Sequence, residues 1–537
     1  MPYTGDRLAP IRTAAVRVRT RTRLAVLIPD LALVAACVTL FYCLFLFAGY
    51  RKLFRDSDAG WHIRTGEAIL ATGTLPHSDP YSFSRPNQPW MDWEWLSDVA
   101  AGAAHRAAGL TGVALLYAVA IAAGVWLWFR LQWISGGNFF LAAAMAPLML
   151  TTCGLHWMAR PHVFGWLFLL GSVLLAERGR PNLILVALLS ALWANMHASF
   201  FFAPVIFLVY AAGAFVGQAI LPADSSSAES RSVAYLAAAL VSAIAPLANP
   251  YTWHLYTHVF RYLTDSDLLA RIGEYQSFDF HSAGSFQIAA ALLIGAAGGI
   301  LALGRKRPEH FFLAALFCIL ALRSARALPL AALVLLPLAN GAITHALAHA
   351  GGLRPRIRRA LDRFLSYSDN LRALDARGSG LLLVPLAVAL CFLLLETPTI
   401  RAATGFPSSE FPVAAYPHIP PDARLFAPDK FGGYLIYRSS GRLKVFFDGR
   451  SDFYGADFLK RYGRLVQARP GWQQYLDSFA FSHALLPPDA PLLAALEQAG
   501  WERVYRDATA VLLRKPSPER FVLQQFNTQH PESVQEP

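Results

Sequence analysis

The amino-acid sequence predicts a polytopic α-helical membrane protein with one α/β domain at its C-terminal end. The chain has 537 residues, of which 55% are hydrophobic and only 15% are charged, and its mean hydropathy is +0.38. Soluble domains usually contain about a quarter charged residues. Apolar segments long enough to cross hydrocarbon as helices recur through residues 24–397. Residues 398–516 instead alternate short β-rich runs with helical patterns.

Eleven apolar segments are candidate membrane spans. They are residues 24–50, 110–130, 136–155, 162–177, 181–196, 199–219, 232–248, 285–304, 309–323, 327–347 and 379–397. Residues 1–23 precede them and contain six arginines against one acid, which is typical of a cytoplasmic N-terminus. The five cysteines all lie in apolar runs, so we expect them to pack as small apolar side chains rather than form disulfides or bind metals.

Basic residues indicate the orientation of these spans. With the N-terminus in the cytoplasm, every second connection is cytoplasmic, and these connections contain Arg178 and Arg180, Arg231, the basic run 305–307, and seven arginines within 348–378. The remaining connections, of which 51–109 is the largest, are then extracytoplasmic, as is the segment after about residue 398. We therefore expect a multi-pass protein of a bacterial plasma (inner) membrane.

The extracytoplasmic domain is predicted as a small mixed sheet covered by helices. Strands are expected at 424–427, 434–437, 444–447, 483–486, 503–505 and 510–513, and helices at about 455–468 and 490–499. Gly432 and Gly433 are interpreted as a turn. The run Asp448-Gly449-Arg450 follows a predicted strand, where a local ion pair is favoured over a site. Residues 517–537 are polar and are predicted to be disordered.

The outer loop 51–109 contains the densest group of candidate functional residues. Asp56 and Asp58 stand two apart, directly before Trp61 and His62. Two such carboxylates can share a divalent cation, Mg²⁺ or Mn²⁺, or one can act as a general base; the alternative is a solvated acidic turn. Glu94 lies between two tryptophans at the start of a predicted interfacial helix, 94–108. It could orient a substrate hydroxyl or merely cap that helix.

Further polar residues occur at the extracytoplasmic ends of later spans. They are Arg160, His162, His197, Glu274, Arg323 and Arg326. Arg323 and Arg326 lie in an extracytoplasmic connection, although basic residues usually concentrate on the cytoplasmic side. Binding of a lipid-linked phosphate would explain basic residues at this position. Ionisable groups among helix ends often mark a site. We therefore expect these side chains to converge with Asp56, Asp58, Glu94 and His62 on one cavity.

This combination resembles the GT-C-type membrane glycosyltransferases, in an uncharacterised bacterial, mannosyltransferase-like branch. The resemblance rests on the first span, the Asp56–Asp58 and Trp61–His62 motifs in a large outer loop, Glu94 before an interfacial helix, the multi-span core and the outer C-terminal domain. It implies a GT-C-like fold over residues 24–397 and an inverting transfer from a polyprenyl-phosphate sugar to a glycan, lipid or protein acceptor. An acid of the first outer loop, Asp58 or Asp56, would be the base or a metal ligand.

Two other functions compete with this hypothesis. A transporter or flippase of a lipid-linked anion predicts polar residues through the bilayer midplane and internal repeats, and neither is evident. A non-catalytic membrane assembly protein predicts that Asp56 and Asp58 point into solvent. No nucleic-acid partner is expected, because the basic residues do not cluster on the soluble part.

Overall fold

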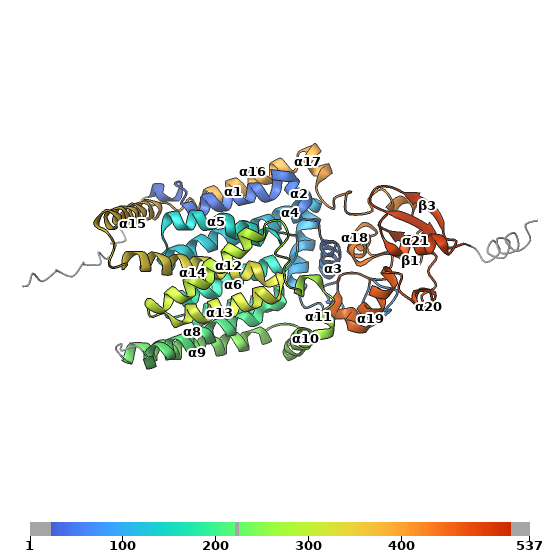
Figure 1. The fold of residues 1–537 in the computed structure, drawn as a ribbon. Helices are drawn as coiled ribbons and strands as arrows, with labels where there is room; N and C mark the ends of the chain where they lie inside the picture. The colour runs from blue at the N-terminus through green and yellow to red at the C-terminus, as the bar shows by residue number, and fades with distance from the viewer. Residues whose placement is uncertain (1–22, 221–224, 517–537) are drawn as a thin grey trace, which may run out of the picture.

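A computed structural model describes residues 23–220 and 225–516. A long bundle of helices lies at one end of the molecule and an α/β domain at the other, with helix α3 between them (Figure 1). We call the end of the bundle that faces the α/β domain the proximal end, and the opposite end the distal end. The basic N-terminus 1–22 and the tail 517–537, predicted to be cytoplasmic and disordered respectively, lie outside the described residues.

The bundle contains a helix in each of the eleven predicted segments. Its helices are α1 (Leu31–Phe45), α2 (Gly49–Lys52), α4 (Trp95–Ile134), α5 (Phe139–Gly154), α6 (His162–Glu177), α7 (Leu183–Met196), α8 (Phe202–Ile220), α9 (Ser225–Ile244), α12 (Ser285–Gly304), α13 (Pro308–Arg323), α14 (Leu328–Ala348) and α16 (Leu383–Leu395). Short 3₁₀ helices connect or extend them: η1 (Arg23–Val26), η2 (Leu46–Ala48), η3 (Ala198–Phe201), η4 (Ala245–Leu247), η5 (Gly273–Tyr275) and η6 (Ala325–Ala327).

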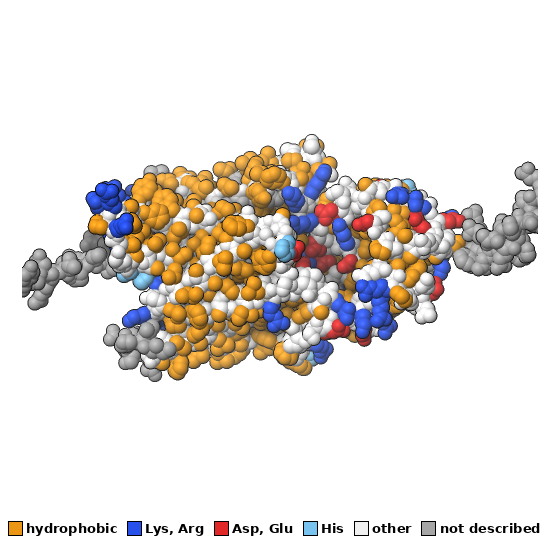
Figure 2. Space-filling model, viewed as in Figure 1, with side chains coloured by type: hydrophobic (Ala, Val, Ile, Leu, Met, Phe, Trp, Pro, Cys, Tyr) orange, Lys and Arg blue, Asp and Glu red, His pale blue; other side chains and the backbone are white. Residues whose placement is uncertain are grey.

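The bundle has the apolar surface of a membrane protein. Figure 2 shows hydrophobic side chains over most of the visible face of the bundle, and charged side chains at the distal end and on the α/β domain. Within the described residues, five helices are long and apolar enough to cross a membrane, and five more are apolar but shorter. The number of eleven spans therefore stays a prediction.

Several helix boundaries follow from capping side chains. Asp30 is not inside the first span, because α1 begins at Leu31 and the Asp30 carboxylate accepts the backbone N–H of Leu33 at 2.8 Å. Its other oxygen pairs with Arg130 at 2.9 Å. Asn138 caps α5 and Asn182 caps α7 in the same way. At the distal end, α15 (Pro355–Asp375) is amphipathic and basic and covers the ends of α5 and α14.

The outer loop folds against both parts of the molecule. It contains α3 (Asp58–Thr72) and the predicted interfacial helix, which continues into the span as the single helix α4 after a kink at Ala108 and Gly109. The spacing of Trp253, Tyr256, Val259 and Phe260 predicts a second interfacial helix over 253–264, and α10 (Trp253–Thr264) matches it. Helix α11 (Ser266–Leu269) follows at the proximal end. All of these helices border the junction with the α/β domain (Figure 1).

The α/β domain contains one four-stranded sheet in the order β1-β2-β4-β3. Its strands are β1 (Leu425–Phe426), β2 (His483–Leu486), β3 (Glu502–Arg506) and β4 (Val511–Arg514). The β1–β2 pair is parallel and the other two pairs are antiparallel. Its helical elements are α17 (Pro398–Ala403), η7 (Tyr416–His418), α18 (Asp429–Arg438), α19 (Ser451–Val466), α20 (Trp472–Asp477) and α21 (Pro491–Gln498).

Two of the predicted strands are wrong. Residues 434–437 belong to α18, and the predicted turn at Gly432 and Gly433 is helical too. Gly433 lets α18 pack closely on the start of α3, and Gly432 lets it pack on the backbone of Phe447 and Asp448. Residues 444–447 form no strand of the sheet. Val445 instead makes a single bridge to Ser82 of the outer loop, so its backbone pairing is satisfied by another part of the chain.

Candidate functional site

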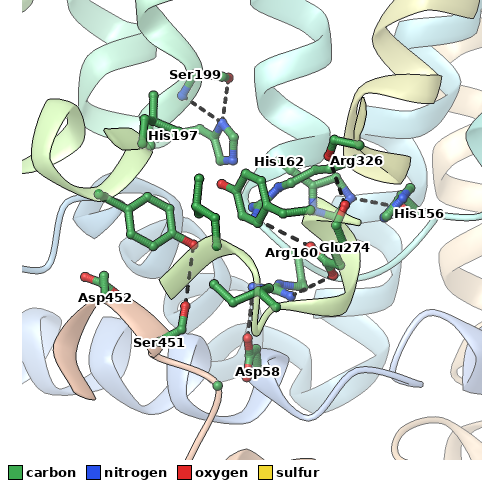
Figure 3. A pocket seen from close by; sticks show the side chains of 18 of the residues that line it. Asp58, His156, Arg160, His162, His197, Ser199, Glu274, Arg326, Ser451 and Asp452 are labelled. Atoms are coloured by element: carbon green, nitrogen blue, oxygen red, sulfur yellow. Dashed lines mark hydrogen bonds and ion pairs between the residues drawn. The ribbon is translucent and has the colours of Figure 1, made fainter. Parts of the chain in front are cut away.

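A cavity of about 1420 Å³ lies between the proximal end of the bundle and the α/β domain. It is lined by nine of the predicted site residues, Asp56, Asp58, Glu94, Arg160, His162, His197, Glu274, Arg323 and Arg326. Figure 3 shows side chains from the bundle and from the α/β domain pointing into this space, and Figure 2 shows acidic side chains gathered in the recess where the two parts meet. Nine of the ten side chains that we expected to converge therefore line one cavity, His62 does not, and the roles of all ten stay predictions.

Arg160 joins the two aspartates of the outer loop. Its Nη1 atom lies 2.9 Å from Asp56 Oδ2, and its Nη2 atom lies 2.8 Å from Asp58 Oδ2. Nη1 is also 3.6 Å from Oε1 of Glu274. One guanidinium thus neutralises carboxylates on both sides. The motif for which we considered a shared cation, a general base or a solvated acidic turn is part of an arginine-centred network.

Glu274 connects Arg160 to a second arginine. Its Oε2 atom lies 3.5 Å from Nη1 of Arg326, whose guanidinium stacks over the Tyr275 ring with 5.4 Å between guanidinium carbon and ring centroid. Burial alone would raise the pKa of Glu274, but the charges of Arg326 and Arg160 lower it to about 2. Glu274 is therefore ionised at neutral pH and holds both guanidinium groups at the cavity.

The side chain of Asp58 is buried, and apart from Arg160 it faces the backbone of the α/β domain. Helix α3 begins at Asp58, and the backbone of Gly449 from the α/β domain covers the carboxylate so closely that a Cβ on Gly449 would lie 2.1 Å from Oδ1. Burial, reinforced by nearby acids and only partly offset by Arg160, raises the pKa of Asp58 to about 7. Such a carboxyl group can exchange a proton near neutral pH.

Glu94 is the second buried carboxylate of the cavity wall, and its neighbours are histidines. Its Oε1 atom lies 3.5 Å from Nε2 of His197, and its Oε2 atom lies 4.0 Å from Nε2 of His62. Burial is also the main cause that raises the pKa of Glu94 to about 7. Glu94 does not form an arginine ion pair within residues 23–220 and 225–516, so its carboxylate is freer than that of Asp58 to accept a proton from a bound molecule.

His62 lies behind the cavity wall rather than in it. Its ring is buried, and Nδ1 lies 2.6 Å from Oδ1 of Asp98, a residue that the sequence analysis did not single out. Nε2 has no hydrogen-bond partner within the described chain and faces Glu94. Burial holds the pKa of His62 well below its ordinary value. His62 is therefore placed to act through Glu94, not to contact a substrate.

The α/β domain closes one side of the cavity with polar groups. It contributes Asp429, Lys430, Gly449, Ser451 and Asp452 to the lining. Ser451 and Asp452 lie on this side of the cavity (Figure 3). Asp452 lies 3.2 Å from Nε2 of His258 in α10, and the Ser451 hydroxyl lies 3.4 Å from that of Tyr262. The site is thus divided between two parts of the molecule, and neither part is complete without the other.

The side of the cavity that faces the bundle is apolar. The lining there includes Phe202 and Val205 from α8, Leu316 and Leu320 from α13, and Leu330 from α14. Of these helices, α8 and α13 also expose hydrophobic side chains on the surface of the bundle, among them Leu208 and Ile319. Arg323 stands at the proximal end of α13 and is exposed; it has no ion-pair partner in the described part of the chain.

The predicted metal site does not fit the residues that are present. Across the described ranges, no group of three or more His, Cys, Asp or Glu side chains is arranged to hold a metal ion. The space between Asp56 and Asp58, where a shared cation was one alternative, is taken by the Arg160 guanidinium. A metal ligand needs a free oxygen lone pair facing the ion, and the facing oxygens here already accept charge-assisted bonds.

Sequence reasoning missed several residues of this site. His156 and Tyr262 line the cavity, and Asp98 supports His62. Asp98 could have been found, because it follows Glu94 by four residues on a helical pattern and must share its face. His156 and Tyr262 carried no comparable signal, since each comes from a separate connection whose position only the fold decides.

Comparisons with solved structures identify the architecture. A structure of the archaeal oligosaccharyltransferase AglB from Archaeoglobus fulgidus, in complex with an inhibitory peptide and a dolichol-phosphate, aligns with a TM-score of 0.50 and 12% identity, over 85% of this chain and 69% of that one. The Archaeoglobus fulgidus oligosaccharyltransferase in its apo form aligns with a TM-score of 0.49 and 12% identity, over 84% and 69% of the two chains. No protein-family model and no curated protein matches the chain. The chain thus shares its fold with this archaeal oligosaccharyltransferase, which agrees with the GT-C-like fold expected from the sequence, while the bacterial, mannosyltransferase-like branch stays a prediction.

Proposed function

We propose that this protein is a membrane glycosyltransferase that moves a sugar from a polyprenyl-phosphate donor to an extracytoplasmic acceptor. The observation that carries the proposal is the composition of the cavity. One wall is apolar and is formed by side chains of α8, α13 and α14, while arginines and buried carboxylates line the same cavity at the proximal end of the bundle. An amphiphile with a lipid tail, an anionic phosphate and a polar sugar matches that division.

The donor would enter between the membrane helices. Its isoprenoid chain lies along Leu316, Leu320 and Leu330, and its phosphate reaches Arg326 and the unpaired Arg323. Guanidinium groups suit a phosphate because they donate paired, charge-assisted hydrogen bonds in a fixed plane. As the sugar leaves, negative charge grows on the bridging phosphate oxygen, and fixed cations at that position stabilise the transition state.

The acceptor would approach from the side of the α/β domain. A buried carboxylate, Asp58 or Glu94, takes the proton of the acceptor hydroxyl or amide. The acceptor atom forms a bond to the anomeric carbon while the bond from that carbon to the phosphate oxygen breaks. The lipid phosphate departs with the electron pair, and the anomeric configuration inverts. Asp56 keeps Arg160 in place during this step rather than accepting the proton itself.

The fold comparison is consistent with this substrate class. The solved AglB structure of similar fold was bound to a dolichol-phosphate and an inhibitory peptide, so that protein accepts a lipid phosphate and a peptide. We extend only the lipid-phosphate donor class to the present chain, because its cavity independently has the apolar wall and the arginines. A glycan, a lipid or a protein remain candidate acceptors.

Binding of the donor class tests the proposal directly. The full-length protein in lipid nanodiscs is titrated with a polyprenyl monophosphate and, in parallel, with the corresponding polyprenol. The monophosphate should bind, and Arg326→Gln should weaken it by roughly ten- to a hundredfold, the loss expected for a charged hydrogen bond. Arg271→Gln, an exposed arginine outside the cavity, is the matched control. Equal binding of phosphate and alcohol would contradict a phosphate site.

Activity requires a second experiment in cells. Glycolipids and glycans of a strain lacking the protein are compared with those of strains complemented by the wild type, Asp58→Asn or Glu94→Gln. The wild type should restore a glycosylated product, and at least one of the two variants should not. If both variants restore the product fully, neither carboxylate is the base.

The two alternative functions receive less support. A transporter needs a polar path to the distal end, yet the buried polar groups there bond to one another: Asn340 with Gln132 and Asn138, and Glu177 with Arg307 and His310. A non-catalytic assembly protein would let Asp56 and Asp58 face solvent, whereas both line the cavity together with Arg160, His197 and Glu274.

A further inference from the structure

The position of Arg160 between Asp56 and Asp58 carries an inference beyond the class of reaction. A shared divalent cation was one of the roles that the sequence left open for these carboxylates, and a guanidinium lies between them, at 2.9 Å from one and 2.8 Å from the other. We propose that Arg160 is the permanent cation of this site, so that Asp56 and Asp58 bind no divalent metal ion. What this inference means for catalysis rests on the proposed function, but the experiment that tests it does not.

The carboxylate oxygens leave no room for a metal. Oδ1 of Asp56 accepts the backbone N–H of Asp58 at 2.9 Å, and its Oδ2 accepts from Arg160. Oδ2 of Asp58 also faces Arg160, and the remaining oxygen lies under the backbone of Gly449. Mg²⁺ needs near-octahedral oxygen ligands at about 2.0–2.1 Å, and Mn²⁺ prefers the same kind of ligand. The described donor set offers no such geometry.

The charges around Arg160 also disfavour the binding of a divalent cation. Three acids, Asp56, Asp58 and Glu274, surround Arg160, and Arg326 supplies a second positive charge. A dication added to this group would lie against a guanidinium that is only 17% exposed, where solvent screens little of the repulsion. The network is therefore already close to charge balance without a metal.

Arg160 cannot easily swing away to admit an ion. The preceding residue, Ala159, is buried and donates its backbone N–H to the carbonyl oxygen of Leu53 at 2.8 Å. The next residue, Pro161, starts α6 and has a fixed φ. The backbone on both sides is anchored, so the guanidinium is presented to the aspartates by a rigid helix start.

Manganese binding tests this inference without any assay of transfer. The full-length protein is titrated with Mn²⁺, and free Mn²⁺ is followed by electron paramagnetic resonance. The wild type should show no saturable site at millimolar Mn²⁺. Arg160→Ala should bind Mn²⁺ roughly a hundredfold or more tightly than the wild type, because one like charge at contact distance has been removed. The double variant Arg160→Ala with Asp56→Asn should lose that gain.

Arg323→Ala is the matched control, because Arg323 lines the same cavity but bridges no carboxylate pair. It should not create a manganese site. Arg160→Gln, which keeps polar volume and hydrogen-bonding atoms, replaces the alanine variant if that variant does not fold. The thermal midpoint of either Arg160 variant should rise on adding Mn²⁺, while that of the wild type should not.

Two results would overturn the inference. One is saturable Mn²⁺ binding by the wild type that Asp58→Asn abolishes, a test that needs no Arg160 variant. The other is an Arg160 variant that folds and still binds no metal, since the aspartates would then lack a cation site for another reason. Neither result bears on the donor: failure of polyprenyl-phosphate binding would instead count against the proposed function.

Discussion

The Cα atom of Gly60 in α3 approaches the backbone of Gly433 in α18 so closely that a Cβ on Gly60 would lie 2.1 Å from the Gly433 carbonyl oxygen. In turn, a Cβ on Gly433 would lie 2.2 Å from the carbonyl oxygen of Ser57. The partners are backbone atoms, which cannot move aside. Two helices from segments far apart in sequence thus touch through their glycines, directly beside Asp58.

Substitution of Gly433 should therefore loosen the α/β domain from the outer loop. Gly433→Val should lower the free energy of unfolding by about 1–3 kcal/mol or more, the range for overpacking a rigid contact. Thermal unfolding in detergent and limited proteolysis of the junction measure the effect. Gly463→Ala in α19 is the control, because a Cβ there meets nothing within 4 Å; it should be neutral or slightly stabilising. Equal behaviour of the two variants would contradict the contact.

Arg450 should be required for the stability of the α/β domain. Its guanidinium is buried and pairs with Asp448 at 2.7 Å and with Asp79 of the outer loop at 2.8 Å. Removal of one partner from a buried pair leaves uncompensated charge, and typically costs about 3–5 kcal/mol. Arg450→Gln should therefore unfold at a much lower temperature. Arg514→Gln, which breaks an exposed pair with Glu502, should change the free energy of unfolding by less than about 1 kcal/mol.

The free energy of unfolding should fall as pH rises, because buried Asp92 holds a proton in the folded protein. This residue is buried, neither of its oxygens has a hydrogen-bond partner within the described chain, and burial raises its pKa from 3.8 to about 8. The folded protein keeps a proton that the unfolded chain releases, so the stabilisation from this group is complete below the unfolded pKa and is lost as pH rises through the folded pKa. Over about pH 4 to 8 the loss is on the order of a few kcal/mol.

Asp92→Asn should flatten this dependence, because the amide cannot ionise. The thermal midpoint measured across the same pH interval should decline less for this variant than for the wild type. Asp489→Asn, at an exposed position, should follow the wild type. A wild-type midpoint that stays constant or rises with pH would show that Asp92 is ionised in the folded state.

The rate of sugar transfer should rise with pH through about 7. Asp58 and Glu94, the two candidate bases, each have a pKa raised to about 7 by burial, and only the deprotonated carboxylate can accept a proton. Initial rates measured against pH should give an ascending limb with that midpoint, and removal of the true base should reduce the rate by roughly 10²–10⁴-fold. An unchanged rate at acidic pH would argue against both carboxylates.

If Glu94 is the base, substitution of His62 should shift the ascending limb of the plot of transfer rate against pH. His62 contacts Asp98 and faces Glu94 without lining the cavity, so it acts as a positioning residue. His62→Gln should shift the midpoint of the pH profile while donor binding stays within about twofold, since no lining atom changes. A shift in donor affinity without a shift in the pH profile would place His62 in substrate binding instead.

The sequence predicted the parts of this molecule whose signals are local. Helical segments, both interfacial helices and four of the six proposed strands have close counterparts in the structure, because apolar periodicity and β-rich runs depend on neighbours along the chain. Gly432 and Gly433 show the limit. A glycine pair usually marks a turn, but here Gly433 permits a contact with the start of α3 and Gly432 permits one with the backbone of Phe447, and no local pattern records either contact.

The candidate site shows the same difference between local signals, which the sequence contains, and contacts between distant segments, which it does not reveal. Residue type and membrane topology were enough to select Asp58, Glu94, Arg160 and Glu274, all of which line one cavity. The pairing among them could not be read from the sequence. Arg160 is about a hundred residues from the aspartates it joins, and whether it faces a substrate phosphate or a carboxylate depends on how α6 begins beside the outer loop.

The bridge between the outer loop and the α/β domain has a consequence for biosynthesis. Val445 exchanges backbone hydrogen bonds with Tyr81 and Phe83, and Arg450 pairs with Asp79. During translation, these groups of the outer loop gain their native partners only after a segment more than three hundred residues later has been synthesised. A chain truncated before Val445 and Arg450 can therefore not complete the acidic cavity, which forms only once synthesis has passed α16 and reached the α/β domain.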